Sequence, residues 1–184
     1  MRRLTNIIIG LLVLTVSCFA QNLTFVCGPY TLRNVALANG ARYTQSVAPG
    51  AIASLFGSFQ SLAFGQPATL PLPAELSRIE IRFNGIAAPL FYSSPSQINL
   101  QIPWQLLGLS NARVDVVFHS SLCIGGETIS LASFAPGLFS TNQQGAGQAA
   151  ILIANTSFMA APSGLFPGSR PVRRGEYISI FATG

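Results

Sequence analysis

The fold of this 184-residue chain is decided by the stretch Asn84-Gly-Ile-Ala-Ala-Pro-Leu-Phe-Tyr-Ser-Ser-Pro-Ser-Gln-Ile-Asn-Leu-Gln-Ile-Pro-Trp104. Its Asn-Gly pair readily takes positive φ at both positions, which a two-residue type I′ hairpin turn requires. Before the pair, residues 78–83 alternate apolar with charged side chains, as a half-buried strand does. An apolar run at residues 86–92 follows. The stretch therefore predicts a β-hairpin whose two strands are residues 78–83 and 86–92.

The second half of the stretch predicts a turn at Pro95 and then a strand over residues 97–104. The residues of this strand alternate between an apolar face and a face of amides. The apolar face is Ile98, Leu100, Ile102 and Trp104, and the amide face is Gln97, Asn99 and Gln101. A slip of one residue would bury the amides, so the register is well specified. We expect Trp104 in the core and the amide row on the solvent side.

The rest of the chain is typical of an all-β protein, with short apolar runs between turns rich in glycine and proline. Strands are predicted at residues 51–56, 113–119, 127–134, 148–154 and 177–181. An irregular lead-in is expected at 21–34, a short strand or helical turn within 34–45, and long connections at 57–77 and 155–171. This pattern favours a β-sandwich.

An internal echo predicts how the sandwich is repeated. Residues 47–57 align with residues 172–182, and the matched residues lie at one constant offset. Gly50, Ser54 and Phe56 match Gly175, Ser179 and Phe181. The offset fits one sandwich module plus a linker. Residues 172–184 are therefore expected to be the opening strand of a second, truncated module.

Composition and the N-terminal sequence predict export. The chain is 49% hydrophobic and only 8% charged, which argues against disorder and against a cytosolic protein kept soluble by surface charge. Residues 1–20 have two arginines, a short apolar core and a small residue at Ala20, as a cleavable signal peptide does. An uncleaved anchor and lipoprotein processing at Cys18 are the alternatives. We expect a secreted, periplasmic or cell-surface protein without a transmembrane segment after cleavage.

Cleavage after Ala20 would leave two cysteines, Cys27 and Cys123. Two cysteines in an exported chain make one candidate disulfide. The alternative is a pair of buried free thiols.

Several short motifs occur along residues 35–184. They are Val47-Ala-Pro-Gly50, Asn84-Gly with Ala88-Pro-Leu-Phe-Tyr92, Ser94-Pro-Ser-Gln-Ile-Asn99, Gln101-Ile-Pro-Trp104, Ala135-Pro-Gly-Leu-Phe139, and Arg174-Gly-Glu-Tyr with Thr183-Gly184. Together they resemble the uncharacterised C-terminal domain common in secreted acidobacterial proteins. The Pro-Gly, apolar strand and Gly-Ser-Phe order resembles the opening of IPT/TIG-type immunoglobulin-like domains. The resemblance implies an extracytoplasmic immunoglobulin-like module and carries no catalytic residues.

The expected organisation combines these signals. It is a signal peptide (1–20), a lead-in (21–34), an immunoglobulin-like β-sandwich (35–140), a strand with a Pro/Gly-rich linker (141–171), and the opening of the second module (172–184). Such domains usually continue beyond Thr183-Gly184, so we expect a fragment, a truncated reading frame, or a protein completed by a partner.

The first functional hypothesis is a non-catalytic module for surface architecture, adhesion or protein interaction. If its last strand lacks a neighbour, the exposed edge invites another protein or a β-strand to pair with it. The alternative is a carbohydrate-binding module that uses an amide and aromatic sheet face. Its candidate residues are Tyr92, Gln97, Asn99 and Gln101. The competing interpretation is that this row is simply the solvent face.

The groups that carry chemistry are few, so we expect no catalytic residue, metal or cofactor. After the signal there is one histidine, His119, and the acids are Glu75, Glu80, Asp115, Glu127 and Glu176. Asp115 and His119 would lie about 13 Å apart along one strand, too far for a hydrogen bond. No nucleophile-elbow, P-loop or dinucleotide motif occurs, which leaves a hydrolase as a remote alternative. The arginines form no stripe interleaved with aromatics, so nucleic-acid binding is not expected.

Overall fold

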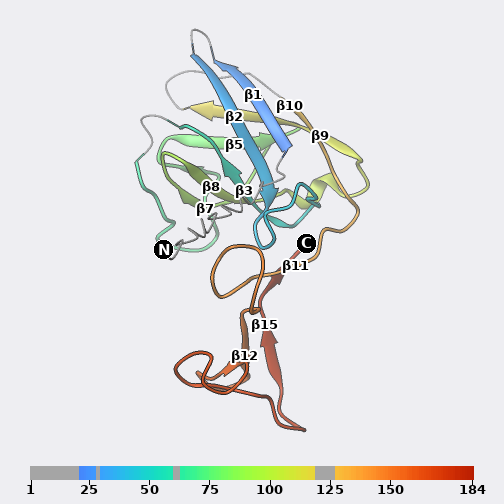
Figure 1. Cartoon of the computed structure of the whole chain (residues 1–184). Helices are drawn as coiled ribbons and strands as arrows, with labels where there is room; N and C mark the ends of the chain where they lie inside the picture. The colour runs from blue at the N-terminus through green and yellow to red at the C-terminus, as the bar shows by residue number, and fades with distance from the viewer. Residues whose placement is uncertain (1–20, 28–29, 60–62, 119–126) are drawn as a thin grey trace, which may run out of the picture.

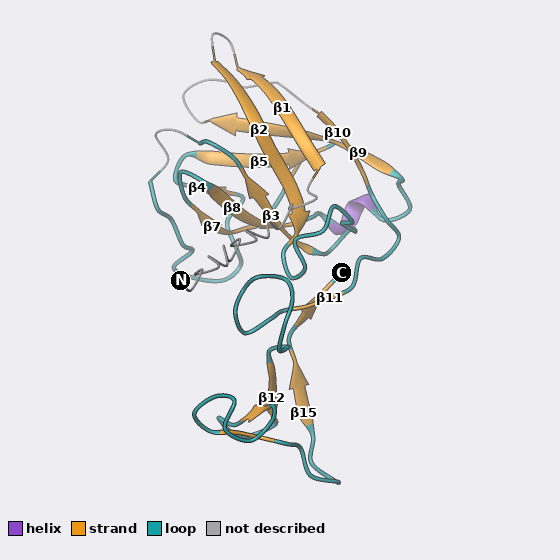
Figure 2. Cartoon of the chain, viewed as in Figure 1, coloured by secondary structure: helices purple, strands orange, loops and turns teal. Residues whose placement is uncertain are grey.

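The structure is a computed structural model that describes residues 21–27, 30–59, 63–118 and 127–184 (Figure 1). In this part of the chain every regular element is a strand, apart from a single 3₁₀ turn, η1, at Trp104–Leu106. Two five-stranded sheets form a body, and two smaller sheets form an arm that projects from it (Figures 1 and 2). The prediction of an all-β fold is therefore confirmed. The predicted signal segment, with Cys18, lies outside the described residues.

The body is a sandwich of two antiparallel sheets. The first sheet has the order β1-β2-β3-β8-β7, and the second has the order β10-β9-β5-β4 with β6 also paired to β5. The first sheet consists of β1 (Gln21–Cys27), β2 (Tyr30–Asn39), β3 (Ile52–Phe56), β8 (Gln97–Gln101) and β7 (Leu90–Ser93). The second consists of β10 (Glu127–Ser130), β9 (Asn111–Phe118), β5 (Ile79–Phe83), β4 (Glu75–Leu76) and β6 (Ile86–Ala87).

Both sheets contribute alternate residues to one apolar core. The fully buried side chains include Leu37, Leu55, Ile98 and Leu100 from the first sheet and Ile79, Ile81, Phe83, Val114 and Val116 from the second. This is the pattern expected when the inner faces of two sheets interdigitate. The alternation seen in the sequence at residues 79–83 and 97–101 places the predicted residues inward.

The Asn84-Gly85 hairpin is confirmed. Asn84 has φ 49° and Gly85 has φ 80°, and Phe83 pairs with Ile86 across the turn. The Asn84 side chain also accepts a hydrogen bond of 2.8 Å from the N–H of Arg113 on the neighbouring β9. The turn residue therefore ties the hairpin to the next strand of the second sheet.

The single return strand predicted for residues 86–92 is wrong, because the chain changes sheets within it. β6 ends at Ala87 in the second sheet, and β7 begins at Leu90 in the first, where it pairs with β8. Pro89 lies between them and has no N–H to donate to a ladder. Ala88 and Leu90, on either side of Pro89, are both fully buried, so the sequence shows one continuous apolar run where the structure has two strands.

The irregular lead-in predicted for residues 21–34 is also wrong. β1 and β2 pair antiparallel from Gln21↔Leu37 to Cys27↔Tyr30, with one irregularity between Leu23 and Phe25. β2 then pairs with β3, which joins this hairpin to the first sheet. Threonine, valine, phenylalanine and tyrosine are frequent here, and these residue types favour strands.

The core position predicted for Trp104 is wrong as well. β8 ends at Gln101, Pro103 interrupts the ladder, and the chain enters the 3₁₀ turn. Trp104 is 63% exposed, whereas Leu106 in the same turn is buried in the core cluster. The alternation of the strand therefore stops before it reaches Trp104.

The arm consists of residues 137–184. At its base, β11 (Gly137–Leu138) pairs with β16 (Ala182–Thr183). Further out is a four-stranded sheet with the order β14-β13-β12-β15. Its strands are β12 (Ile151–Ile153), β13 (Met159–Ala160), β14 (Ser169–Arg170) and β15 (Ile178–Ile180). The predicted last strand, residues 177–181, corresponds to β15. The expectation that it has no neighbour is wrong on one side, because β12 pairs with it. On its other side β15 is the edge of its sheet.

Candidate interaction surfaces

The predicted amide row lies on the outer face of the first sheet, and its members are half-buried. Asn99 Oδ1 accepts hydrogen bonds from Gln97 Nε2 at 2.7 Å and from Ser54 Oγ at 3.0 Å. Gln101 Nε2 instead donates to the carbonyl oxygen of Gly50 at 3.0 Å. Much of the amide row therefore holds β8 to its surroundings, which is the structural role that such side chains often have.

Tyr92 is brought to this row by the pairing of β7 with β8, which sets it opposite Asn99. Residues opposite each other in antiparallel strands project from the same face, so the aromatic ring and the amides share one surface. Within the described residues, no hydrogen bond is formed by the Tyr92 hydroxyl, Gln97 Oε1 or Asn99 Nδ2. These three groups could form hydrogen bonds to a polar ligand, whereas the amide N–H of Gln101 already donates to Gly50.

Trp104 forms a second exposed aromatic feature, next to Gly50. A Cβ placed on Gly50 would lie 2.3–2.4 Å from three atoms of the indole, so the ring rests directly on the glycine. Gly50 also has φ +82°, a conformation that glycine adopts without steric cost. Because one part of the ring covers Gly50 and the side chain is 63% exposed, the indole is held flat and open to solvent. The sequence contains a signal for the exposure of Trp104, because Pro103 before it ends the strand.

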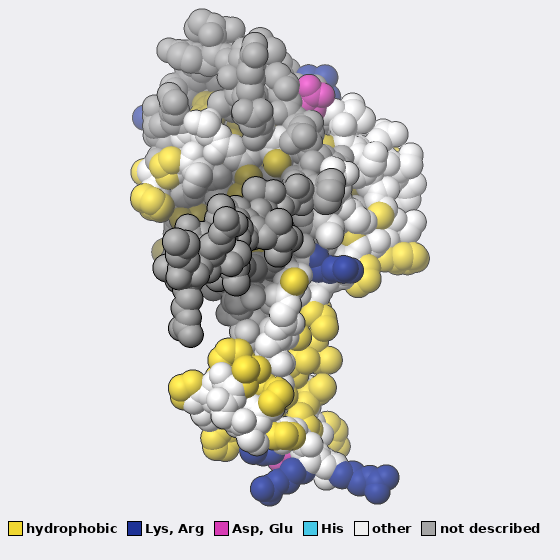
Figure 3. All heavy atoms as spheres, in the orientation of Figure 1, with side chains coloured by type: hydrophobic (Ala, Val, Ile, Leu, Met, Phe, Trp, Pro, Cys, Tyr) yellow, Lys and Arg dark blue, Asp and Glu magenta, His cyan; other side chains and the backbone are white. Residues whose placement is uncertain are grey.

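The arm carries many exposed apolar side chains, and Figure 3 shows apolar side chains running along it below the body. All three residues of β15 are exposed. The exposed apolar side chains of the arm are Leu138, Phe158, Leu165, Val172, Tyr177, Ile178, Ile180 and Phe181, with Tyr177 at 81%. Large apolar patches on a protein surface usually mark a contact with another molecule.

An ion pair between Glu176 and Arg170 stabilises the outer end of the arm. Glu176 accepts two hydrogen bonds from the Arg170 guanidinium, at 2.6 and 2.8 Å, and one of 2.6 Å from the N–H of Arg173. The Arg170 guanidinium also lies 5.6 Å from the centre of the Phe158 ring. The hydrogen bonds from Arg170 and from the Arg173 N–H lower the pKa of Glu176 from 4.5 to about 2. Arg170 therefore has a structural role at this end of the arm.

Acid is expected to open this end of the arm. Because the folded pKa of Glu176 is depressed, its contribution to stability is complete above pH 4.5 and is lost as the pH falls toward about 2. An NMR titration of the Glu176 side chain should give a midpoint near pH 2. Glu176→Gln should remove the acid sensitivity of this end of the arm. A midpoint near 4.5 in the folded protein would contradict the paired geometry.

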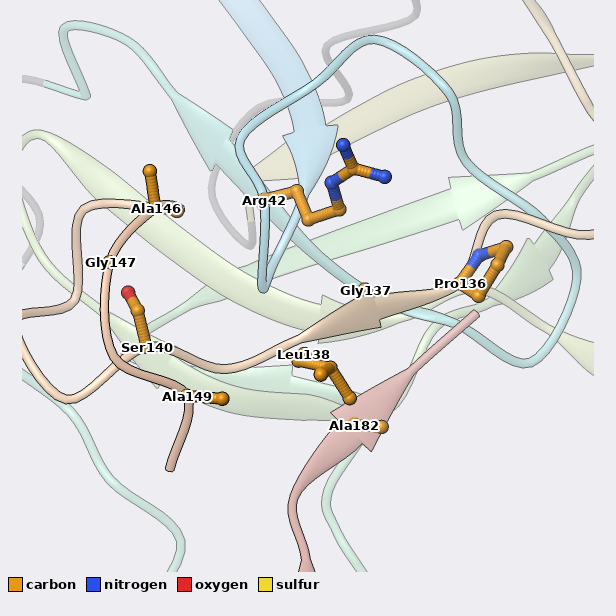
Figure 4. Close-up of a pocket in the computed structure, with 10 residues that line it drawn as sticks. Arg42, Pro136, Gly137, Leu138, Ser140, Ala146, Gly147, Ala149 and Ala182 are labelled. Carbon is orange, nitrogen blue, oxygen red and sulfur yellow. The ribbon is translucent and has the colours of Figure 1, made fainter. Parts of the chain in front are cut away.

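A shallow hollow of about 360 Å³ lies where the arm meets the body (Figure 4). Glycine and alanine make up much of its wall, and Arg42 is the charged residue among those that line it. The junction beside it is fixed by Asn39 Nδ2, which donates to the Ala135 carbonyl at 2.7 Å, and by the Ile52 N–H, which donates to Thr183 Oγ1 at 2.6 Å. The hollow thus marks the contact between arm and body. Its lining contains one hydroxyl side chain, Ser140, which accepts a hydrogen bond of 3.2 Å from the N–H of Gln144.

Two pairs of charged side chains in the body are local in sequence. Arg82 bonds to Glu80 at 2.9 and 3.1 Å, and Arg113 bonds to Asp115 at 2.9 Å. In the described ranges, no group of three or more His, Cys, Asp or Glu side chains is placed to hold a metal ion. No helix in the same ranges is long and apolar enough to cross a bilayer. His119 and Cys123 lie outside the described residues, so the predicted Cys27–Cys123 disulfide stays a prediction.

The fold and these surfaces define an all-β protein with a two-sheet sandwich body and a projecting β-arm. Comparisons with protein-family models, with curated proteins and with solved structures found no match to this chain.

Proposed function

We propose that this protein is a non-catalytic, extracytoplasmic immunoglobulin-like module that binds another protein surface through its arm. The observation that carries the proposal is β15, an edge strand whose residues are all exposed and whose flanks, Tyr177 and Phe181, are exposed at 81% and 50%. An open edge together with an apolar surface provides both backbone and side-chain groups for a partner. Export is supported by the signal-like sequence at residues 1–20 and by the low charge.

The proposal is tested by photo-cross-linking in an exporting bacterium that produces the chain. Benzoylphenylalanine replaces Tyr177 in one strain and Phe134 in a control strain. Phe134 is a matched control, because it is an aromatic residue with 79% exposure outside the arm. We expect protein adducts from position 177 and few from position 134. Equal adducts at both positions, or none at position 177, would overturn the proposal.

Two finer features belong to the same proposal, namely cleavage after Ala20 and a Cys27–Cys123 disulfide. Both are supported by the sequence of an exported chain with two remaining cysteines. The intact mass of the secreted protein, measured with and without reductant, tests them together. A mass that includes residues 1–20, or two alkylatable thiols before reduction, would contradict them.

A carbohydrate-binding role is a second candidate, favoured by the exposed Trp104. The indole of Trp104 lies flat over Gly50 and offers a stacking surface to a sugar. The polar groups of Tyr92, Gln97 and Asn99 that have no hydrogen-bond partner within the described residues offer hydrogen bonds. Titration with polysaccharides should then shift the fluorescence of Trp104, the only tryptophan. Unchanged fluorescence together with an empty glycan array would remove this candidate.

A further inference from the structure

We propose that the partner of the arm is a second copy of this chain, joined by antiparallel pairing of β15 with β15 about a two-fold axis at Ser179. This inference rests on the proposed function, because it names the occupant of the same edge. It is carried by four features of the strand: the direction of its backbone groups, the symmetry of its sequence, its echo of a central strand in the body and the absence of edge protection.

The backbone of β15 presents hydrogen-bonding groups to solvent at defined residues. The N–H of Ala154 donates to the carbonyl of Tyr177 at 2.9 Å, and the N–H of Phe181 donates to the carbonyl of Ala150 at 3.3 Å. Because the two directions alternate along an antiparallel strand, Ser179 also faces β12. The N–H and C=O groups of Ile178 and Ile180 therefore point to the open edge.

The sequence Tyr177-Ile-Ser-Ile-Phe181 reads nearly the same in both directions. With Ser179 opposite its own copy, Ile178 faces Ile180, and Tyr177 faces Phe181. The outward groups of Ile178 then bond those of Ile180 in the other copy. The aromatic and isoleucine pairs also match, and such cross-strand pairs stabilise antiparallel sheets. A two-fold interface requires this kind of self-complementary surface.

The echo with the body indicates that this strand belongs in the middle of a sheet. Ser54, which matches Ser179, has neighbours on both sides: Ala38 in β2 and Asn99 in β8. Among the residues that the structure describes, Ser179 pairs only with Leu152 of β12, and β15 ends the sheet. A second β15 would fill the position that β8 fills in the body.

Nothing in the strand protects its open edge. Natural edge strands often carry lysine, proline or an inward charge that blocks further pairing. Residues 177–184 contain none of these, and Glu176 before them is held by Arg170. The arm also extends away from the body, so antiparallel pairing places the two bodies at opposite ends of the joined arms (Figure 1).

Disulfide trapping of the purified chain tests the register. In the proposed dimer, Ser179 faces Ser179 in a non-hydrogen-bonded pair, whose spacing suits a disulfide, so Ser179→Cys should cross-link to itself under mild oxidation. Ile180→Cys is the matched control, because each copy of that residue faces Ile178. Trypsin cleaves after Arg174, so the product is a disulfide-linked pair of the peptides 175–184. We expect about tenfold more linked peptide from Ser179→Cys than from Ile180→Cys, since only the former satisfies the disulfide geometry.

Light scattering of the unmodified chain accompanies the trapping, and a concentration-dependent dimer is expected. A monomer at high concentration with no linkage at position 179 would overturn the self-pairing. Equal linkage at positions 179 and 180 would overturn the two-fold register. The adducts at position 177 separate the two proposals. An adduct of twice the chain mass supports both, whereas an adduct with another protein keeps the proposed function and refutes self-pairing.

Discussion

Replacing Gly50 by alanine is expected to lower the free energy of unfolding by about 2–4 kcal/mol. Two effects add at this position. Alanine is strained at φ +82°, and its Cβ would lie 2.3–2.4 Å from the indole of Trp104, which must swing away. Chemical denaturation followed by Trp104 fluorescence measures both the loss of stability and the displacement of the ring.

Gly85→Ala separates these two effects. Gly85 has φ +80°, but nothing lies within 4 Å of a Cβ placed on it, so this variant should lose only about 1–2 kcal/mol from the backbone. In a Trp104→Ala background, the cost of Gly50→Ala should fall to the cost of Gly85→Ala. If Gly50→Ala and Gly85→Ala lower the free energy of unfolding by the same amount with Trp104 present, the indole does not contact Gly50 as described.

Replacing Asn39 by alanine is expected to cost about 2–4 kcal/mol, because it leaves buried backbone groups without partners. The Asn39 side chain is 1% exposed. It donates to the Ala135 carbonyl at 2.7 Å and accepts from the N–H groups of Ala41 and Arg42 at 3.0 and 3.1 Å. Thermal unfolding measures the loss, and faster proteolysis between residues 141 and 148 should show that the base of the arm has loosened.

Asn111→Ala is the control for the Asn39 substitution. Asn111 is an exposed strand residue whose described side-chain bond is a long contact of 3.4 Å to Ser110 Oγ, so its removal should change stability by less than about 0.5 kcal/mol. If Asn39→Ala were as mild as Asn111→Ala, the side-chain hydrogen bonds of Asn39 to Ala135, just before the arm, and to Ala41 and Arg42 would not form as described.

The sequence predicts the body well where one sheet face is buried and the other is not. Residues 79–83 and 97–101 alternate clearly, so both the strands and their inward faces are correct. The step at Pro89 is missed because β6 and β7 both pack apolar residues against the core, and only the pairing partners show which sheet each joins. Trp104 is misplaced because the apolar alternation of the sequence continues past Pro103, where the ladder of the structure ends.

The candidate surfaces are predicted less completely, because they depend on contacts between distant strands. Alternation places Gln97 and Asn99 on the outer face, but their bond network requires Ser54, which the pairing of β3 with β8 brings beside Asn99. The strand at residues 177–181 is predicted from its apolar residues. Its exposure is not, because the same residues would also suit a buried strand.

Hydrogen exchange along β15 tests the central claim, that this strand offers an open edge for pairing. The N–H groups of Ile178 and Ile180 point outward, whereas that of Ser179 faces β12. In dilute protein we predict fast exchange at 178 and 180 and slow exchange at 179. At high concentration, residues 178 and 180 should become protected, while 179 changes little. Protection of all three at every dilution, or of none at any concentration, would contradict the account.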